Sequence, residues 1–389
     1  MSAPASVMVV GASLAGLRAV EALRRRGYDR PITWIGAEGV LPYDRPPLSK
    51  QVLRGEFTAE RVALKANYAA LGVEPLLGVR ATGLDATART VALSDGRVLP
   101  YHAVIVATGA TPRTLPGAAA LRGVHTLRTL DEALAIREAL GKKPRVAVVG
   151  AGFIGLEVAA SCRALGLEVT VVEGLDVPLE RSVGATMGRA VADLHASEGV
   201  VLRLGTGVER LVGEGDVESL LLADGTTVKA DLVVVGIGVS PTTDWLVGSG
   251  VELDRGVLCD ARCRTSLPDV VACGDVTRFT SAAGGRMHVE HWTNAVEQAN
   301  AAVATLLDGD AAPPYTPLPY FWSDQFDVKL QFAGEISAGD SLRIAQGSVI
   351  TRDLVAVWGR SGRMTAVLTA NNPAKFIRTR RAIAQGAPF

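Results

Sequence analysis

Runs of apolar, β-branched residues alternate with longer amphipathic segments along the chain as far as about residue 310. A short, wholly apolar run of Val and Ile is typical of a strand in a parallel sheet, and apolar residues that recur every three or four positions are typical of a covering helix. The pattern therefore predicts the α/β class. The first predicted elements are a strand at 6–11, a helix at 14–27, strands at 31–35 and 145–150, a helix at 153–166 and a strand at 168–173.

Two parts of the chain repeat one pattern. Each contains a strand, a glycine turn, a helix and a second strand, and each continues into a similar segment, VALSDGRVLPYHAVIVATGATP at 91–112 and LLLADGTTVKADLVVVGIGVSP at 220–241. Such internal similarity indicates one structural module that occurs twice. The first copy holds extra residues, among them PYDRPPLSK at 42–50, which we interpret as an insertion that serves a ligand.

A different pattern follows residue 275. The sequence predicts a helix near 294–307 and then a linker rich in Ala, Pro, Gly and Asp at 308–319. Alternating runs typical of antiparallel strands follow at 328–333, 341–344 and 354–358, with a last helix at 373–385. We therefore expect a small C-terminal α+β domain.

The composition narrows the class of protein. Of 389 residues, 48% are hydrophobic, 21% are charged and 42 are Gly, which excludes a disordered chain. Lys and Arg total 40 and Asp and Glu total 40, and this neutrality argues against a protein built to coat nucleic acid or a membrane surface. Apolar runs such as LVVVGIGV at 232–239 are far shorter than the ~20 residues that span a bilayer, and the opening MSAPASVMVVG lacks a basic region. We expect no membrane span, no signal peptide and a cytoplasmic location.

The four cysteines are Cys162, Cys259, Cys263 and Cys273. They form no C-x-x-C pair and have no His neighbours at metal-ligand spacing. We expect buried, reduced thiols and no metal site.

The clearest chemical motif is a G-x-G-x-x-G pattern formed by Gly150, Gly152 and Gly155, between a predicted strand and a predicted helix. In that context the first Gly permits a tight turn, the second lets the backbone approach a pyrophosphate, and the third allows close packing of helix on strand. Glu173, at the end of the next strand, is placed to bind ribose hydroxyls and to repel the 2′-phosphate of NADPH. Because strand, helix and acid occur together, the pattern favours an NADH site over a glycine turn without a ligand.

A weaker copy of this motif lies near the start of the chain. Gly11, Ser13 and Gly16 follow the first strand, with Ser13 in place of the middle Gly, and Glu38 supplies the matching acid at the end of the second strand. An ordinary βαβ turn is the alternative interpretation of this copy alone. Because redox chemistry needs an electron donor and a carrier together, the two motifs predict a flavin dinucleotide and a nicotinamide dinucleotide.

Seven segments carry a family resemblance that covers nearly the whole chain: GASLAG at 11–16, YDRPPLSK at 43–50, VIVATGATPR at 104–113, VAVVGAGFIGLE at 146–157, CGDV at 273–276, HVEHWTNAVEQA at 288–299 and FWSDQF at 321–326. Together they resemble the FAD-dependent NADH:ferredoxin reductases of bacterial oxygenase systems, within the two-dinucleotide-binding-domain flavoproteins. The resemblance implies two Rossmann-like dinucleotide-binding domains, as in glutathione reductase, and a small C-terminal α+β domain. The implied boundaries are 1–112 with 244–314 for the FAD domain, 113–243 for the NADH domain and 315–389 for the C-terminal domain.

The resemblance also implies which residues hold the cofactors. For FAD these are Gly11, Ser13, Gly16, Glu38, Arg45, Pro47, Lys50, Ala107, Thr108, Gly109, Asp275, Glu290, Trp292 and Trp322. For NADH they are Gly150, Gly152, Gly155, Glu173, Arg181 and Gly238. Asp275 would bind ribitol hydroxyls, and a helix starting near Asn294 would direct its N-terminus at the flavin, although Asn294 and Glu297 also fit a simple helix cap. Trp322 would lie near the flavin, and a core Trp is its alternative interpretation.

Three residues are candidates for catalytic roles on the same ground. Lys50 is expected beside the reactive nitrogen of the flavin, where it would stabilise negative charge; the alternative is a solvated surface lysine. Glu157 and Glu290 are expected at the nicotinamide end of NADH. The alternatives are a surface acid for Glu157 and a partner of His288 or His291 for Glu290. The loop 174–181 departs from the family, which usually carries an arginine where Val177 stands.

The implied reaction passes electrons from NADH through FAD to a [2Fe-2S] ferredoxin that supplies an oxygenase. A quinone or small-molecule radical as acceptor, and a flavoprotein with a mainly binding or scaffold role, are the alternatives. Disulfide reduction is disfavoured because residues 36–64 contain no Cys. A catalytic nucleophile of the protein itself is not evident, since neither a G-x-S-x-G nor an H-E-x-x-H motif is present.

Ferredoxins are usually acidic, so we expect basic docking residues. The last predicted helix offers Lys375, Arg378, Arg380 and Arg381, and the first offers arginines at 24–26. A solvated charged face is the alternative interpretation of either patch. The sequence is compatible with a monomer or a homodimer.

Overall fold

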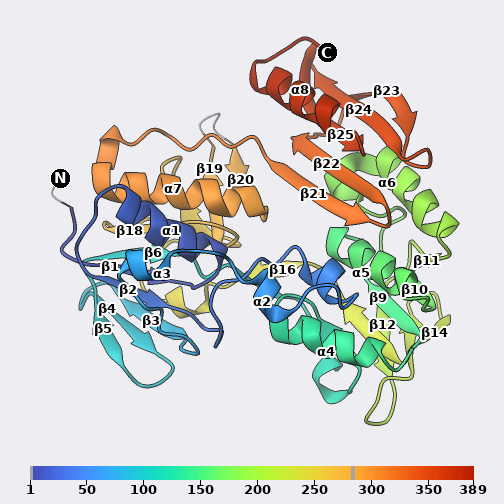
Figure 1. Ribbon diagram of the computed structural model, residues 1–389, viewed down its shortest axis with the longest axis horizontal. Helices are drawn as coiled ribbons and strands as arrows, with labels where there is room; N and C mark the ends of the chain where they lie inside the picture. The colour runs from blue at the N-terminus through green and yellow to red at the C-terminus, as the bar shows by residue number, and fades with distance from the viewer. Residues whose placement is uncertain (1–2, 282–284) are drawn as a thin grey trace. The chain divides into compact units, whose positions relative to one another are not determined.

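The computed structural model describes residues 3–281 and 285–389 (Figure 1). The chain forms two compact units, each assembled from separate stretches of sequence. Unit 1 comprises Met1–Asp44, Ala63–Thr111 and Ser240–Pro319, and unit 2 comprises Arg45–Val62, Pro112–Val239 and Tyr320–Phe389. The short strands β7 (Ala110–Pro112) and β16 (Val239–Pro241) lie where the chain passes from one unit to the other.

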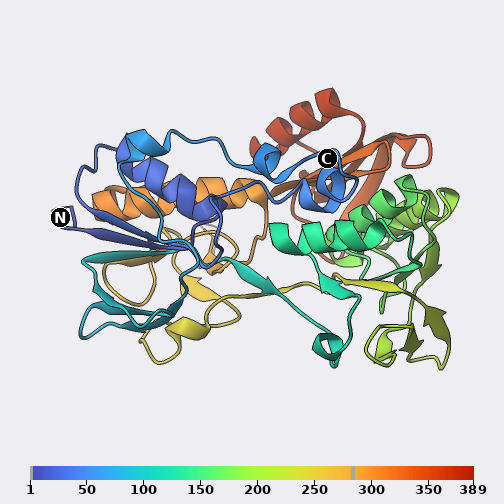
Figure 2. The same cartoon turned by 60° about the horizontal axis from the view of Figure 1, so that its bottom comes forward.

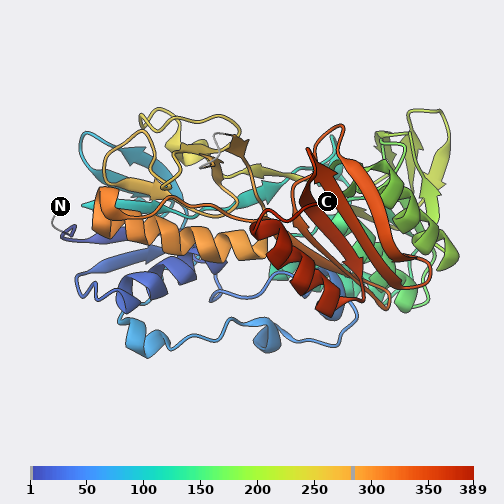
Figure 3. The same cartoon turned by 90° about the horizontal axis from the view of Figure 1, so that it is seen from above.

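Unit 1 is built on a parallel sheet of four strands in the order β18-β6-β1-β2. These strands are β1 (Val7–Val10), β2 (Ile32–Ile35), β6 (Ala103–Val106) and β18 (Val270–Ala272). Every residue of β1, β6 and β18 is buried, as the continuous apolar runs predict. Helices α1 (Leu14–Arg25) and α7 (Trp292–Asp308) pack side by side on one face of this sheet (Figures 1 and 3).

Smaller elements complete unit 1. The antiparallel sheet of β3 (Ala81–Asp85), β4 (Thr90–Leu93) and β5 (Val98–Pro100) lies on the side of the parallel sheet opposite to α1 and α7 (Figures 2 and 3). The remaining elements are α3 (Tyr68–Leu71), β17 (Val257–Cys259), β19 (Thr277–Thr280), β20 (Arg286–Met287), and the 3₁₀ turns η3 (Asp244–Leu246) and η4 (Gly309–Ala311).

Unit 2 contains the second parallel sheet, with strands in the order β11-β10-β9-β15-β8. They are β8 (Val124–Thr126), β9 (Val146–Val149), β10 (Val169–Val172), β11 (Val201–Arg203) and β15 (Leu232–Val235). The helices of this part are α4 (Leu130–Leu140), α5 (Phe153–Ala164) and α6 (Glu180–Ser197). A three-stranded sheet of β12 (Val208–Val212), β13 (Ser219–Leu222) and β14 (Thr227–Lys229), the 3₁₀ turn η2 (Ala118–Ala120), the short helix α2 (Ala59–Val62) and the π-helical turn η1 (Leu48–Val52) also belong to unit 2.

The C-terminal part of unit 2 is an antiparallel sheet in the order β21-β22-β25-β24-β23. The strands are β21 (Tyr320–Gln325), β22 (Val328–Gly334), β23 (Ser341–Ser348), β24 (Asp353–Arg360) and β25 (Arg363–Ala370), and helix α8 (Pro373–Ala384) packs against β22 and β25 (Figure 1). The α/β class and the C-terminal α+β domain are thus confirmed. Strands β21 and β25 are not among the predicted ones.

Helix α7 corrects one expectation. It begins at Trp292 with His291 at its N-cap, so Asn294 lies inside the first turn and does not cap the helix. Asn294 is buried, its Nδ2 atom donates to the carbonyl of Val289 at 2.9 Å, and its Oδ1 atom accepts from the Tyr315 hydroxyl at 3.0 Å. The side chain fixes the start of the helix from within unit 1.

Within residues 3–281 and 285–389, no helix combines the length and apolarity needed to cross a membrane.

Candidate functional site

In unit 1, the predicted FAD residues gather at the carboxyl edge of the parallel sheet. Gly11 follows β1, residues 107–109 follow β6, and Asp275 follows β18 after two intervening residues. Because neighbouring parallel strands end at the same edge, these positions converge although they are far apart in sequence. This is the edge at which doubly wound sheets bind ligands.

The turn after β1 has the geometry of a pyrophosphate cradle. Gly11 has a φ of 123°, and a Cβ atom there would lie 2.1 Å from the carbonyl oxygen of Ala107. Ser13 has an extended backbone and is the N-cap of α1, so the N-terminus of this helix opens onto the same edge. A Cβ atom on Gly16 would lie 1.8 Å from the Gly11 carbonyl, so helix and turn pack too closely for any other residue.

Glu38 lies beyond the position that the sequence predicts. Strand β2 ends at Ile35, and Glu38 follows in a bend, where the Tyr43 hydroxyl donates to its Oε2 atom at 2.6 Å. The carboxylate is therefore fixed by the start of the inserted segment and not by the strand itself.

The turn that carries Asp275 is tied to α7. The N–H of Gly274 donates to Oε1 of the buried Gln298 at 2.8 Å, and the Thr277 hydroxyl donates to the same oxygen at 3.0 Å. In the loop after β6, the Thr108 hydroxyl donates to the carbonyl of Thr242 at 2.8 Å. These contacts hold the two loops at the carboxyl edge in one arrangement.

Two predicted residues at the start of α7 have partners in unit 1. The indole N–H of Trp292 donates to Oδ1 of Asp44 at 2.8 Å. Glu290 is exposed, and its Oε1 atom lies 2.8 Å from Nε2 of His288. The alternative interpretation of Glu290 as a partner of His288 is therefore confirmed.

The pair of His288 and Glu290 holds a proton between its members. Nδ1 of His288 lies 2.8 Å from the carbonyl oxygen of Thr277, so this nitrogen carries a hydrogen. Nε2 then contacts a carboxylate oxygen, and that contact is a hydrogen bond only if the imidazole or the carboxyl group carries one more proton. The hydrogen bond to Glu290 raises the pKa of His288, against the opposing effect of burial.

Unit 2 carries the second glycine turn at the carboxyl edge of its own parallel sheet. Gly150 has a φ of 101°, and a Cβ atom there would lie 2.4 Å from the carbonyl oxygen of Gly236, which follows the neighbouring strand β15. A Cβ atom on Gly155 would lie 2.1 Å from the carbonyl of Gly150. The packing of the protein itself thus requires these two glycines.

Gly152 has no such requirement. It is the N-cap of α5, its φ of −75° suits any residue, and a Cβ atom there would have no neighbour within 4 Å. Open space at a helix N-terminus, next to a turn of backbone N–H groups, fits a diphosphate. The residues present therefore fit a dinucleotide on unit 2.

Glu173 directly follows β10, as predicted, and faces the glycine turn. Its Oε2 atom accepts from the N–H of Ala151 at 2.7 Å, and its Oε1 atom accepts from the N–H of Leu175 at 3.0 Å. Arg181 lies exposed in the first turn of α6. Gly238 has a φ of 96°, and its carbonyl accepts from the N–H of Arg113 at 3.0 Å.

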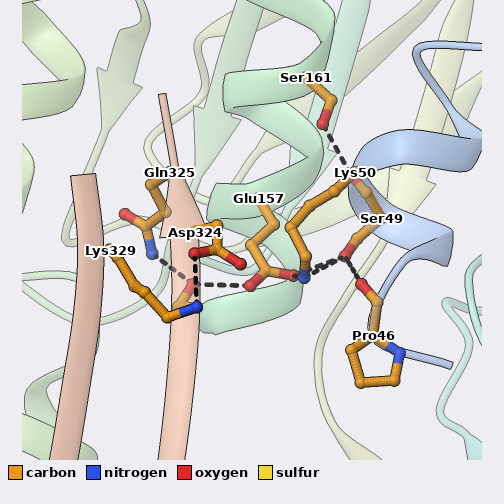
Figure 4. A network of polar contacts seen from close by, with 9 residues as sticks. Pro46, Ser49, Lys50, Glu157, Ser161, Asp324, Gln325 and Lys329 are labelled. Atoms are coloured by element: carbon orange, nitrogen blue, oxygen red, sulfur yellow. Dashed lines mark hydrogen bonds and ion pairs between the residues drawn. The ribbon is translucent and has the colours of Figure 1, made fainter. Parts of the chain in front are cut away.

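The structure brings together two of the predicted catalytic residues, Lys50 and Glu157 (Figure 4). The Nζ atom of Lys50, on η1, donates to Oε2 of Glu157, on α5, at 2.6 Å, and their side chains are only 5% and 6% exposed. The hydroxyl of Ser49 donates to the same Oε2 at 2.5 Å, and the hydroxyl of Ser323 donates to Oε1 at 2.7 Å. Both alternative interpretations, a solvated lysine and a surface acid, are wrong.

The remaining residues of unit 2 that the sequence predicts to bind FAD are Arg45, Pro47 and Trp322. Arg45 donates from its guanidinium to the carbonyl of Arg128, and the carbonyl of Pro47 accepts from the N–H of Lys50 at 3.1 Å, which starts η1. Trp322 is half-buried and stacks on Tyr320 with ring centroids 5.8 Å apart, so it is not a core residue of the C-terminal sheet.

The sequence analysis missed four polar residues around Glu157: Ser49, Ser323, Gln325 and His195. All four are buried. Ser49 adjoins Lys50 in an insertion already singled out. Ser323 and Gln325 are two positions apart in FWSDQF, so on a strand they lie on the same face. No comparable signal marks His195.

The cysteines follow the prediction. Cys162, Cys259, Cys263 and Cys273 are free and buried. Burial raises the pKa of the thiols of Cys162 and Cys273 to about 12, so they stay protonated at neutral pH. Among the described residues, no cluster of His, Cys, Asp or Glu forms a metal site.

The basic residues at the two ends of the chain differ. At the end of α1, Arg24 donates to backbone carbonyls and the C-cap residue Arg26 pairs with Asp308, so both are engaged within unit 1. On α8, Lys375 donates to Gln346 and the Arg380 guanidinium lies over the Tyr320 ring. The remaining two predicted docking residues, which lie on the exposed side of the same helix, are Arg378 and Arg381.

Comparison with known proteins places this geometry in a family. A family model described as pyridine nucleotide-disulphide oxidoreductase matches residues 5–299, and one described as reductase C-terminal matches residues 320–389. The ferredoxin–NAD(+) reductase component of the anthranilate 1,2-dioxygenase system of Burkholderia cepacia is 38% identical over 98% of this chain and 94% of its own length. Putidaredoxin reductase of Pseudomonas putida is 35% identical over 100% of this chain and 94% of its own length.

Solved structures agree with the sequence relatives. The covalent complex of putidaredoxin reductase with putidaredoxin contains a chain with a TM-score of 0.94 and 34% identity, covering 100% of this chain and 94% of that one. A ferredoxin reductase from Rhodopseudomonas palustris gives a TM-score of 0.94 at 35% identity, covering 99% and 96%. The chain therefore belongs to the pyridine nucleotide-disulphide oxidoreductase family, with the ferredoxin–NAD(+) reductases that carry the reductase C-terminal domain.

Proposed function

We propose that this chain is a flavoprotein oxidoreductase that passes electrons from NADH through FAD to a ferredoxin. The proposal depends on one observation: the parallel sheet of each unit has a glycine turn and a helix N-terminus at its carboxyl edge, and the space at Gly152 is open. When bound, FAD accepts a hydride from NADH and releases electrons one at a time. Two relatives named ferredoxin–NAD(+) reductases, at 38% and 35% identity, and putidaredoxin reductase, at 35%, support the same reaction.

In unit 1, we assign FAD to the carboxyl edge of the sheet β18-β6-β1-β2. The N–H groups that follow Gly11 and the N-terminus of α1 would bind its diphosphate, and the Glu38 carboxylate would accept from ribose hydroxyls. Asp275, in a turn held by Gln298, is proposed to bind the ribitol chain. Residues 107–109 would line the same edge.

In unit 2, we assign NADH to the glycine turn from Gly150 to Gly155. Glu173 already accepts from the N–H of Ala151, so its charge lies directly at the turn. A dianionic 2′-phosphate close to this carboxylate is repelled, which favours NADH over NADPH. Arg181 is proposed to contact the adenosine end.

Lys50 and Glu157 supply a fixed charge pair to the reaction. Two of the three N–H bonds of the Lys50 ammonium are directed at Glu157 and Ser49. The third has no acceptor among residues 3–281 and 285–389, so we propose that it serves the bound cofactor. Glu157 holds the ammonium in place and balances its charge inside the protein. Glu290, paired with His288, is proposed to act at the nicotinamide end.

The ferredoxin partner is proposed to carry a [2Fe-2S] cluster and to dock on α8. Arg378 and Arg381 present charge on the exposed side of this helix, next to Ile377, which is 60% exposed. Two basic residues beside an exposed apolar residue fit an acidic protein partner. Because NADH is a cofactor of the cell interior, we propose that the reaction takes place in the cytoplasm, by a monomer or a homodimer.

Anaerobic spectroscopy of the purified, FAD-reconstituted protein tests this function. We expect a flavin spectrum that NADH bleaches, and reduction of a [2Fe-2S] ferredoxin from the source organism by the bleached protein. A protein that stays colourless after reconstitution overturns the proposal. A flavin that NADH bleaches but that reduces a quinone and none of the organism's ferredoxins favours the alternative acceptor.

A further inference from the structure

A chain of buried polar side chains runs from the ion pair of Lys50 and Glu157 to a histidine on α6. Ser323 contacts Oε1 of Glu157 at 2.7 Å, Nε2 of Gln325 lies 3.0 Å from the Ser323 hydroxyl, and Oε1 of Gln325 lies 2.9 Å from Nε2 of His195. Ser323, Gln325 and His195 are each 0% exposed. Figure 4 shows the Gln325 side chain directed toward the group around Glu157.

Every hydrogen bond in this chain has a defined direction. An ionised Glu157 only accepts, so Ser323 donates its single hydrogen to Oε1. The Ser323 oxygen must then accept, and only the NH₂ group of Gln325 can donate to it. The amide oxygen of Gln325 therefore faces His195, and Nε2 of His195 must carry a hydrogen. Reversing Gln325 would leave Ser323 without a hydrogen for Glu157.

His195 is suited to be the last member of this hydrogen-bonded series, as a neutral imidazole that donates a hydrogen bond to Gln325. Burial lowers its pKa to about 4, although the hydrogen bond to Gln325 acts in the opposite direction. Its Nδ1 atom has no hydrogen-bond partner among the described residues, and a neutral imidazole with its hydrogen on Nε2 leaves only an acceptor unpaired there. A cationic ring would instead bury an unpaired N–H and a net charge.

We propose that Ser323, Gln325 and His195 are positioning residues that fix the anionic Glu157 carboxylate, and through it Lys50, for the reaction with NADH. Because Ser323 and Gln325 lie on β21, the C-terminal domain takes part in the NADH half of the reaction, besides any role in docking a ferredoxin. The inference rests on the proposed function of Glu157.

The series of hydrogen bonds from Glu157 to His195 holds the carboxylate charge in place and does not conduct protons. A hydroxyl or an imidazole passes a proton by accepting one and releasing another, but an amide between them would have to form an unstable imidic acid. Gln325 therefore interrupts any relay from Glu157 to His195. Its amide dipole instead directs a hydrogen toward Ser323, and each bond in such a chain strengthens the next.

A double-mutant cycle tests the positioning role. Stopped-flow bleaching of the flavin at saturating NADH is measured for the wild-type protein, Ser323→Ala, Gln325→Met, Glu157→Gln and the double variant Ser323→Ala with Glu157→Gln. We expect Ser323→Ala and Gln325→Met each to slow bleaching about three- to tenfold, the effect of losing one ordinary hydrogen bond. If Ser323 acts through Glu157, the double variant is no slower than Glu157→Gln alone.

Thr369→Val is the matched control. Thr369 is buried in the same C-terminal sheet, on β25, and its hydroxyl has no partner among the described residues. The substitution keeps the shape of the side chain and should leave the bleaching rate unchanged. Circular dichroism and FAD content identify any variant that does not fold.

Nitrogen NMR of protein labelled with ¹⁵N-histidine gives a second readout that does not depend on activity. We expect His195 as one neutral tautomer with its hydrogen on Nε2, from about pH 6 to pH 8. A hydrogen on Nδ1 overturns the proposed direction of the chain. A wild-type bleaching rate in Ser323→Ala beside a slow Glu157→Gln, or slowing that multiplies in the double variant, overturns the positioning role and leaves the proposed function standing. Failure of NADH to bleach the wild-type flavin overturns the proposed function itself.

Discussion

The ammonium of Lys50 and the carboxylate of Glu157 form an ion pair with an N to O distance of 2.6 Å, although 107 positions separate them in the sequence. A buried ion pair is stable only if the polar atoms of both groups also form hydrogen bonds. The hydroxyls of Ser49 and Ser323 donate these hydrogen bonds to the carboxylate oxygens of Glu157. The pair joins the inserted segment, on η1, to the helix that starts at the second glycine turn. Under the proposed function, stability and chemistry in unit 2 depend on the same atoms of this pair.

Removing one member of this pair should destabilise the fold more than removing both. Glu157→Ala leaves a buried, unpaired ammonium, and we expect it to lower the free energy of unfolding by about 3–5 kcal/mol. Lys50→Met combined with Glu157→Leu should recover most of that loss while abolishing rapid flavin reduction. Urea unfolding monitored by circular dichroism measures the first effect. A Glu157→Ala protein as stable as wild type would contradict the buried ion pair.

Gly150 and Gly152, both in the second glycine turn, should respond differently to alanine. Gly152→Ala meets open space, so we expect a change in unfolding free energy below about 1 kcal/mol and a weaker affinity for NADH. Gly150→Ala combines a positive φ with a contact of 2.4 Å to a backbone oxygen and should destabilise the fold strongly. Thermal unfolding and NADH titration separate the two. Unchanged NADH affinity in Gly152→Ala would remove the assignment of this space to the diphosphate.

Glu173 should set the preference between the two nicotinamide cofactors. Glu173→Gln keeps the size and an acceptor for the Ala151 N–H but removes the charge, so we expect the NADH to NADPH ratio of kcat/KM to fall by about tenfold or more. Glu173→Ala also loses the cap on the glycine turn and should weaken both cofactors. Equal ratios in Glu173→Gln and wild type would mean that another residue distinguishes the ribose.

Acid should destabilise the protein through the buried His195 and the half-buried His291. Burial lowers the pKa of His195 and of His291 to about 4, whereas an unfolded histidine has a pKa of about 6.5. Between these values the unfolded state binds more protons, so stability falls as the pH drops through this window, by about 1.4 kcal/mol per pH unit for each group. Urea unfolding at several pH values measures the slope. A His291→Asn variant should show a smaller slope than wild type, and an equal slope would contradict the lowered pKa of His291.

Charge reversal on α8 should affect only the ferredoxin step. Arg378→Glu together with Arg381→Glu is expected to slow ferredoxin reduction by about tenfold at low ionic strength and less at high salt, with NADH to ferricyanide turnover unchanged. Arg210, exposed on β12, offers a control: Arg210→Glu introduces charge reversal elsewhere and should leave both rates alone. Slowing of ferricyanide turnover in the α8 variant would point to damage of the fold and not to lost docking.

Much of the fold could be predicted from the sequence because its signals are local. The apolar runs around β1 and β9 are short and continuous, and the glycines at Gly11 and Gly150 stand where each strand meets its helix, so the two modules and their dinucleotide turns are visible without coordinates. The family resemblance, confirmed by the matches over the chain, rests on the same segments. Strand β2 ends at Ile35, as the sequence predicts, but Glu38 lies in the bend beyond it, where the hydroxyl of Tyr43 from the inserted segment donates to its carboxylate.

The sequence by itself determined the class of fold, the two glycine turns and the residue types from which a redox site could be assembled. The tertiary structure alone decided that η1 groups with unit 2, that Lys50 meets Glu157, and that Ser323, Gln325 and His195 complete their surroundings. The physical reason is that helix and strand periodicity reflects neighbours a few residues apart. A buried charge, in contrast, is stabilised by whichever donors the packing of distant segments brings within about 3 Å.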